Sequence, residues 1–126
     1  MNTFNIGRSG EQKAVAWLES KDYKIIERNF RRRGFEVDIV AIDLNGVLRF
    51  IEVKTVVEGS VLDVAYSVEH RNIANYYKAV DSFILKHPEY NDQQMSMDVL
   101  MVYEDTITLH ENVTGGTVIL QIPFLS

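Results

Sequence analysis

The pattern of apolar and polar positions along the chain predicts a mixed α/β domain. Apolar residues at helical spacing indicate one helix over residues 9–21 and a second over residues 68–86, which Pro88 ends. Runs rich in β-branched residues predict strands over residues 23–28, 36–43, 47–55, 96–103, 106–110 and 117–122. The order α-β-β-β-α-β-β-β places helices against a central mixed β-sheet, with residues 1–126 as a single domain.

Short polar signals set the expected limits of these elements. Ser9 and Gln12 match a capping box, so we expect the first helix to begin at Ser9. The polar stretches 29–34 and 58–60 predict loops. The segment Leu44-Asn45-Gly46 separates two β-branched runs and predicts a hairpin between the second and third strands.

Charged residues interrupt the apolar strands of this hairpin. Asp38 lies within the run 37–42, and Glu52 and Lys54 lie within the run 50–54. One interpretation is an exposed sheet face with ordinary alternating charges. The other is a functional site, because ionised groups among apolar neighbours lose hydration and need a partner.

The length of the hairpin loop decides whether two of these carboxylates meet. A two-residue loop would place Asp38 and Glu52 on opposite faces of the sheet. A three-residue loop with Gly46 in the left-handed conformation pairs Asp43 with Val47 and sets Asp38 directly opposite Glu52. We predict the three-residue loop. Carboxylates whose Cβ atoms are about 4.5–5.5 Å apart repel each other, and Mg²⁺, which prefers carboxylate oxygens, would relieve that repulsion.

Glu11 adds a third carboxylate. It shares the sheet-facing side of the first helix with Ala14, Val15 and Leu18. An acid in the first turn of a helix also interacts favourably with the helix dipole, so a purely structural role is the alternative.

Composition narrows the class of protein. The chain has 126 residues, of which 46% are hydrophobic, and its lack of cysteine excludes disulfides and thiolate zinc sites. His70, His87 and His110 lack the spacing of a zinc site, and neither a Walker-type phosphate loop nor a nucleophile elbow is present. Without an apolar run of about 20 residues or an apolar N-terminal segment, we expect a cytoplasmic protein that does not associate with membranes.

Charge is distributed unevenly along the chain. The net charge is −5, yet residues 1–54 hold 10 Lys and Arg against 8 Asp and Glu, and residues 55–126 hold 3 against 10. A solvated acidic half is one explanation. The other is that the first half faces a negatively charged partner, which a nucleic acid would satisfy.

Glu11, Asp38 and the Glu52-x-Lys54 pair together resemble the site of PD-(D/E)xK nucleases. More closely, the first 55 residues resemble the YraN family of bacterial proteins, which is restriction-endonuclease-like in fold and related to archaeal Holliday-junction resolvases. The matching segments are 7–11 (GRSGE), 29–31 (NFR), 36–41 (EVDIVA), 50–55 (FIEVKT) and, further on, 97–99 (MDV). The chain departs from the family pattern at Phe35, where Gly is usual, at Val56, where Arg is usual, and in a second helix whose basic start is reduced to His70 and Arg71.

The resemblance implies a role for each site residue. Metal ligands would be Asp38, Glu52, the backbone carbonyl of Val53 and Glu11, with Mg²⁺ as the cofactor and Mn²⁺ as a substitute. Lys54 would position or activate the attacking water. Phosphates would be contacted by Arg8, Arg31, Arg32 and Arg33, which give affinity without sequence readout. Asp98 is expected to be a buried structural acid outside the catalytic set.

These roles lead to three alternative functions. The first is a Mg²⁺-dependent endonuclease that hydrolyses DNA phosphodiester bonds, with branched or junction DNA as substrate and a homodimer as the assembly that suits a symmetric junction. The second is a catalytically silent nuclease-fold module that binds nucleic acid or a protein partner. The third is a structural or interaction domain whose acids are simply exposed.

Overall fold

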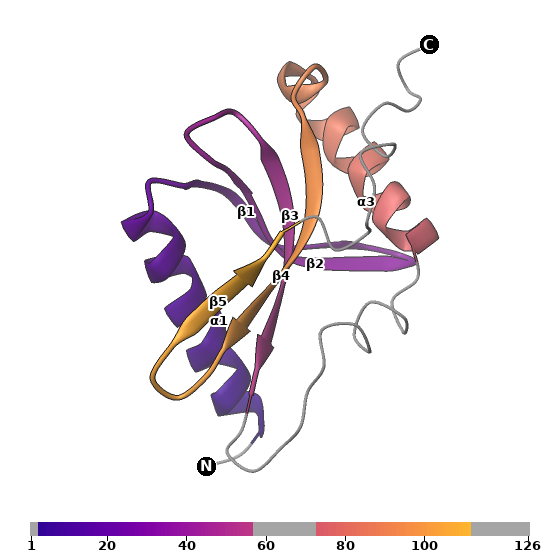
Figure 1. The fold of residues 1–126 in the computed structure, drawn as a ribbon. Coiled ribbons are helices and arrows are strands. Elements are labelled where there is room, and N and C mark those ends of the chain that lie inside the picture. Colours follow the sequence, from indigo (N-terminus) through magenta and orange to yellow (C-terminus); the bar gives the residue numbers. More distant parts are fainter. Residues whose placement is uncertain (1–2, 57–72, 112–126) are drawn as a thin grey trace.

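The computed structural model describes residues 3–56 and 73–111, with side chains described from Ser9 and Tyr76 onward in the two parts. Its elements follow the predicted order as far as the described residues reach (Figure 1). They are α1 (Thr3–Ser20), β1 (Lys24–Arg32), β2 (Phe35–Ile42), β3 (Leu48–Thr55), α3 (Ile73–Lys86), the short 3₁₀ helix η1 (Pro88–Tyr90), β4 (Met95–Val102) and β5 (Ile107–His110). The predicted loop 58–60, the predicted start of the second helix at 68–72 and the predicted strand 117–122 lie outside the described residues.

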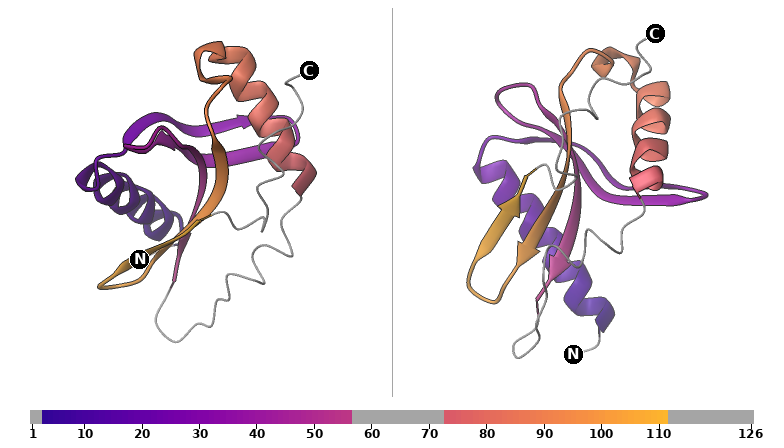
Figure 2. Two further views of the ribbon diagram at one scale, coloured as in Figure 1. Left: turned by 45° about the horizontal axis from the view of Figure 1, so that its top comes forward. Right: turned by 45° about the vertical axis from the view of Figure 1, so that its right-hand side comes forward.

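The strands form one mixed sheet in the order β1-β2-β3-β4-β5. Only β3 and β4 pair in parallel among the described strands, and α3 lies in the connection between them. The helices cover opposite faces of the sheet, as the two views in Figure 2 show. The mixed α/β fold predicted from the sequence is therefore confirmed.

Alternating side chains of the central strands build the two cores. On one face, Ala14 and Leu18 of α1 pack with Ile39 and Ile51. The residues that α3 packs against on the other face are Phe30, Val40, Leu48, Phe50, Met95 and Met97. Because both faces of β3 and β4 are covered, these strands read as nearly continuous apolar runs.

The predicted three-residue loop between β2 and β3 is confirmed. Paired residues run from Ile42↔Leu48 to Ile39↔Ile51, and Asp43 accepts a hydrogen bond from the Gly46 N–H at 3.0 Å. Gly46 has a φ of +81°, the left-handed conformation that the loop requires.

Two predicted boundaries are wrong. The first helix begins at Thr3, and Ser9 and Gln12 are exposed residues within it, so they do not form a capping box. β1 continues to Arg32 through most of the predicted loop 29–34, because Phe30 is buried beneath α3 and Arg32 pairs with Phe35. The polar character of this stretch reflects an exposed edge strand.

The central strands separate at one end of the sheet. Pairing between β2 and β3 stops at Ile39↔Ile51, but β2 stays paired with β1 as far as Phe35, and β3 stays paired with β4 as far as Thr55. Figure 1 shows the β1–β2 hairpin running away from β3 and β4 beyond this point. We call the region between residues 35–38 of β2 and residues 52–55 of β3 the fork.

No helix within the described parts of the chain is long and apolar enough to cross a membrane.

Candidate functional site

The fork brings together the acids that the sequence analysis selected. Asp38 and Glu52 lie one step beyond the last paired residues, Ile39 and Ile51. Val53 lies beyond the last paired residues of β2 and β3. Its backbone N–H donates a hydrogen bond of 2.8 Å to Asp38 Oδ2. A side-chain carboxylate thus takes the place of a backbone acceptor and links the two strands where they diverge.

Lys54 lies at the same fork, paired with Glu52. Its Nζ atom is 2.8 Å from Glu52 Oε2, and the two side chains are 40% and 24% exposed. The pair is therefore accessible to solvent and to a ligand. Asp38, Glu52, Val53 and Lys54 occupy one contiguous region, as the sequence analysis predicts.

Burial makes the charged form of Asp38 costly. Burial raises the pKa of Asp38, the Val53 hydrogen bond lowers it, and the negative charges of Glu11, Glu52 and Glu36 raise it, so that it reaches about 6. Four carboxyl groups therefore influence one another at the fork, and Lys54 is the cation paired with one of them. Such an arrangement attracts cations.

Close packing of α1 on β3 holds Glu11 near this group. Gly10 is buried against Thr55, and a methyl group on Gly10 would overlap Thr55 Oγ1. A larger residue at position 10 would therefore force the Thr55 side chain or the helix to shift. The next residue, Glu11, is half-buried, and its negative charge raises the pKa of Asp38.

The donor atoms of Asp38 and Glu52 suit a hydrated magnesium ion. Mg²⁺ is commonly held by one or two carboxylates and keeps several waters. Among the described residues, however, no group of three or more acidic or histidine side chains is arranged to hold a metal. The residues thus fit a two-carboxylate site, with Glu11 as a neighbour.

The predicted phosphate-binding arginines lie at the end of the β1–β2 hairpin. Arg31, Arg32 and Arg33 are exposed, and Arg31 makes only a loose ion pair with Glu36, at 3.9 Å. Arg32 lies over the Phe30 ring, with its guanidinium carbon 5.0 Å from the ring centroid. The side chain of Arg8, in α1, is outside the described residues.

Lys78 of α3 joins these arginines, although the sequence analysis did not select it. Lys78 reaches the hairpin turn: if Gly34 were replaced by a residue with a Cβ atom, that atom would lie 3.6 Å from Lys78 Nζ. The sequence around Lys78 looks like that of any exposed helix face, so it does not show that this lysine lies beside Gly34, 44 residues earlier in the chain. We call Arg31, Arg32, Arg33 and Lys78 the basic tip.

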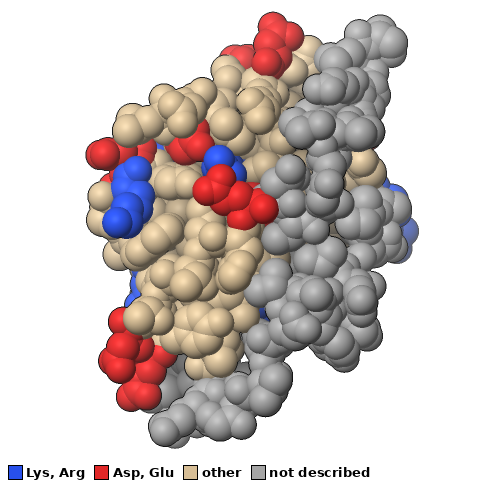
Figure 3. All heavy atoms as spheres, viewed as in Figure 1, with Lys and Arg blue, Asp and Glu red and all other residues tan. Residues whose placement is uncertain are grey.

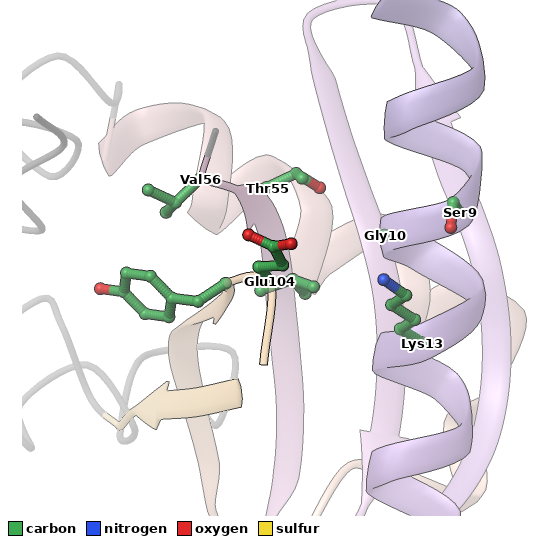
Figure 4. Close-up of a pocket in the computed structure, with 8 residues that line it drawn as sticks. Ser9, Gly10, Lys13, Thr55, Val56 and Glu104 are labelled. Carbon is green, nitrogen blue, oxygen red and sulfur yellow. The ribbon is translucent and has the colours of Figure 1, made fainter. Parts of the chain in front are cut away.

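A small pocket lies on the other flank of α1. It has a volume of about 160 Å³ and is lined by residues that include Gly10, Lys13, Thr55 and Glu104. Figure 4 shows Lys13 on α1 and Glu104 on opposite sides of it. Lys13 and Glu11 are about 200° apart around the helix, so this pocket lies away from Glu11, although Thr55 at the end of the fork also lines it.

Asp98 belongs to an ion-pair network at the other end of β3, as expected of a structural acid. Its carboxylate is fully buried, 3.0 Å from the guanidinium of Arg49, and accepts a hydrogen bond from Ser96. Arg49 also pairs with Asp43 and with Glu111, at 3.0 and 3.1 Å. These ion pairs raise the pKa of Arg49 even though burial opposes its charge.

The view in Figure 3 offers no continuous basic surface over the described residues. Its Asp and Glu side chains form several separate groups, and Lys and Arg reach the surface at few points.

Comparison with known proteins identifies the family. The model of the uncharacterised protein family UPF0102 matches residues 10–102. A UPF0102 protein of Campylobacter lari is 33% identical over 114 residues, which cover 90% of this chain and 97% of the relative. One from Petrotoga mobilis is 37% identical over 101 residues, covering 80% and 88%, and one from Treponema denticola is 32% identical over 104 residues, covering 78% and 80%. The matched span contains the fork, the basic tip, part of α1 and all of α3, and the chain belongs to the UPF0102 family.

Proposed function

We propose that this protein is a Mg²⁺-dependent endonuclease that hydrolyses phosphodiester bonds of DNA. The observation that carries the proposal is the fork itself, where Asp38 and Glu52 converge from strands that are no longer paired. Lys54 stands beside them, 2.8 Å from Glu52. Two carboxylates and a lysine at an open strand end form the minimum set for metal-assisted attack by water on a phosphate.

Each side chain has a separate task in this reaction. Asp38 and Glu52 would hold the ion, which when bound polarises the phosphate and offsets its developing negative charge. Lys54 would leave its ion pair with Glu52 to orient the attacking water and stabilise charge on the phosphate oxygens. Glu11 would accept a hydrogen bond from a water beside the ion. The water oxygen bonds to phosphorus, the ester P–O bond breaks, and the departing oxygen takes up a proton.

The basic tip would position the nucleic acid. Its four cations lie at the end of the hairpin that also carries Asp38, about three residues or 10 Å along β2. Contacts from arginine and lysine to phosphates fix register without reading sequence. A sugar-phosphate backbone can reach both the tip and the fork over this spacing. We propose branched or junction DNA as the substrate, and a homodimer would present two such surfaces to a symmetric junction.

A catalytically silent binding module is the second candidate. The net charge of −5 and the existing Lys54–Glu52 pair favour its protein-binding form, because both reduce the attraction for a polyanion. The raised pKa of Asp38 favours the enzyme, because a binding module gains nothing from a carboxylate that is costly to ionise.

Calorimetry and cleavage assays would separate the two. Mg²⁺ and Mn²⁺ are titrated into the wild type, Asp38→Asn and Asp92→Asn, and each protein is incubated with duplex, single-stranded, flap and four-way-junction DNA. Asp92→Asn is the matched control, because it makes the same change at an exposed aspartate before β4, at the end of the sheet opposite the fork. We expect metal binding and cleavage in the wild type and the control, and neither in Asp38→Asn. Failure of the wild type to bind metal at millimolar concentration would overturn the enzymatic proposal.

A further inference from the structure

Asn29 has a backbone conformation that its position in β1 does not explain. Its φ is +53°, in the left-handed region that residues other than glycine rarely adopt. The other described non-glycine residue of this kind is Asp22, with a φ of 67°, in the turn that ends α1, where a left-handed residue is common. Asn29 lies within a strand, so no helix end or hairpin turn accounts for it.

The conformation accompanies a reversal of the two faces of the hairpin. Arg28 pairs with Ile39, and Phe30 pairs with Val37. Ile39 packs in the core beneath α1, whereas Phe30 and Val37 pack in the core beneath α3. Residues two apart in a regular strand share a face, so the hairpin turns over between these two pairs.

The residues at the turning point are Asn29 and Asp38. The register places them opposite each other, between the pairs on either side. Asp38 reaches the Val53 N–H of β3 from this point. The left-handed conformation of Asn29 is therefore tied to the position of the central acid of the fork.

The side chain of Asn29 is available for a ligand. It is exposed and makes no hydrogen bond within the part of the chain that the structure describes. We propose that Asn29 is a substrate-binding residue, whose side-chain amide donates a hydrogen bond to a phosphate oxygen of nucleic acid bound at the fork. This inference rests on the proposed nuclease function and adds a residue to it.

A neutral donor suits this position better than a cation. The cation at the fork already pairs with an acid, since Lys54 lies 2.8 Å from Glu52. A lysine or arginine opposite Asp38 would form a similar pair. A carboxamide has no net charge, so it remains free to meet a phosphate beside these carboxylates.

A structural explanation competes with this proposal. Asparagine tolerates the left-handed region better than most residues, and it could be present for that reason alone. Glycine adopts the same conformation without steric cost. Asn29→Gly therefore keeps the backbone and removes only the amide, and it distinguishes the two explanations.

The experiment compares Asn29→Gly, Asn29→Asp and the control Asp22→Gly with the wild type. Thermal unfolding is measured first, then the Kd for duplex and four-way-junction DNA without divalent metal, and then cleavage with Mg²⁺. We expect Asn29→Gly to unfold at close to the wild-type temperature but to lose about ten-fold in DNA affinity or cleavage, as for one lost hydrogen bond to a charged group. Asn29→Asp should lose more, because its carboxylate repels phosphate. Asp22→Gly should match the wild type in binding.

The outcomes separate this inference from the function on which it rests. DNA binding and cleavage by Asn29→Gly at wild-type levels would overturn the role of Asn29 and leave the nuclease proposal intact. A wild-type protein that neither binds nor cleaves DNA would overturn both. Asn29→Gly that unfolds far below the wild type would show that the amide supports the fold, which also contradicts the proposal.

Discussion

Among the single residues of the fork, Asp38 is costly to ionise. Burial and three neighbouring carboxylates raise its pKa to about 6 from an ordinary value of 3.8. Because the folded state holds the proton more tightly than the unfolded state, the charge of Asp38 destabilises the fold above pH 6. This penalty declines as the pH falls from about 6 to about 4.

Asp38→Asn should therefore stabilise the protein at neutral pH. Asparagine cannot ionise, and its side-chain oxygen still accepts the Val53 hydrogen bond. We expect a gain of about 2 kcal/mol in the free energy of unfolding at pH 7.5, from about 1.4 kcal/mol for each pKa unit, and little gain at pH 4. Urea unfolding at the two pH values measures it, with Asp92→Asn, at an exposed aspartate before β4, as control. A less stable Asp38→Asn at pH 7.5 would contradict the assigned origin of the pKa shift.

Lys54 should weaken metal binding even though it serves the reaction. Its ammonium group lies 2.8 Å from a carboxylate oxygen of Glu52. A metal ion bound by Glu52 would compete with the ammonium group for this carboxylate. Lys54→Met removes a competing positive charge, so we expect Mg²⁺ to bind several-fold more tightly while cleavage is lost. Calorimetry gives the affinity, and Lys78→Met, at the basic tip, is the control that should leave it unchanged. Equal Mg²⁺ affinity in Lys54→Met and the wild type would show that the pair does not compete with the ion.

At the scale of elements, the contact of α1 with β3 determines where Glu11 lies. A methyl group on Gly10 would overlap Thr55 Oγ1, whereas the Thr55 Cβ atom would remain at an ordinary contact distance of 3.5 Å. Gly10→Ala should lower the free energy of unfolding by about 1–3 kcal/mol, as overpacking commonly does. Thr55→Ala removes the obstructing oxygen, so the double variant should recover most of the loss. A double-mutant cycle by urea unfolding measures this coupling, and additive losses would mean that the helix is held elsewhere.

The elements themselves were largely predictable from the sequence. Alternating and helical apolar patterns locate the described strands and helices, and the segment 44–46 identifies the loop that sets the register of β2 and β3. The extent of β1 was not predictable, because an exposed edge strand carries the same polar residues as a loop.

The site was predictable only in part, because much of it depends on three-dimensional contacts. Asp38, Glu52 and Lys54 stand out as charges within apolar runs, and the structure brings them together. The reversal at Asn29 and the position of Lys78 left no pattern in the sequence, since both arise from packing between distant elements.

At the scale of the whole molecule, cations at the basic tip are opposed by a net charge of −5. Binding to DNA should therefore be sensitive to salt, because neutralised phosphates release counterions. The double variant Arg33→Gln/Lys78→Gln should weaken DNA binding and reduce the slope of log Kd against log salt concentration by up to about 2. Fluorescence anisotropy from 50 to 300 mM salt measures the slope, and Lys13→Gln, on the other flank of α1, is the control. An unchanged slope would place the DNA elsewhere on the surface.

The end of the sheet opposite the fork must hold the central strands together, since the fork separates them. Arg49 does so through Asp43 in the β2–β3 loop, buried Asp98 in β4 and Glu111 after β5. Burial would raise the pKa of Asp43, but its hydrogen bonds from Val47 and Arg49 outweigh this effect and lower it. Asp43 therefore stabilises the fold above its ordinary pKa and loses this contribution as the pH falls through its lower, folded-state value.

Arg49→Leu tests whether this network supports the fork. The change removes the guanidinium that lies 3.0 Å from the buried Asp98 carboxylate, and breaking such a buried pair should cost about 3–5 kcal/mol in the free energy of unfolding. The double variant Arg49→Leu/Asp98→Leu removes both charges and should recover much of that loss, because well-packed apolar residues can replace a buried ion pair. Urea unfolding at pH 7 measures both variants. If the double variant regains stability but loses Mg²⁺ binding, the network positions Asp38 and Glu52 from the far end of β3. If it binds Mg²⁺ as the wild type does, local contacts at the fork alone determine the positions of these carboxylates.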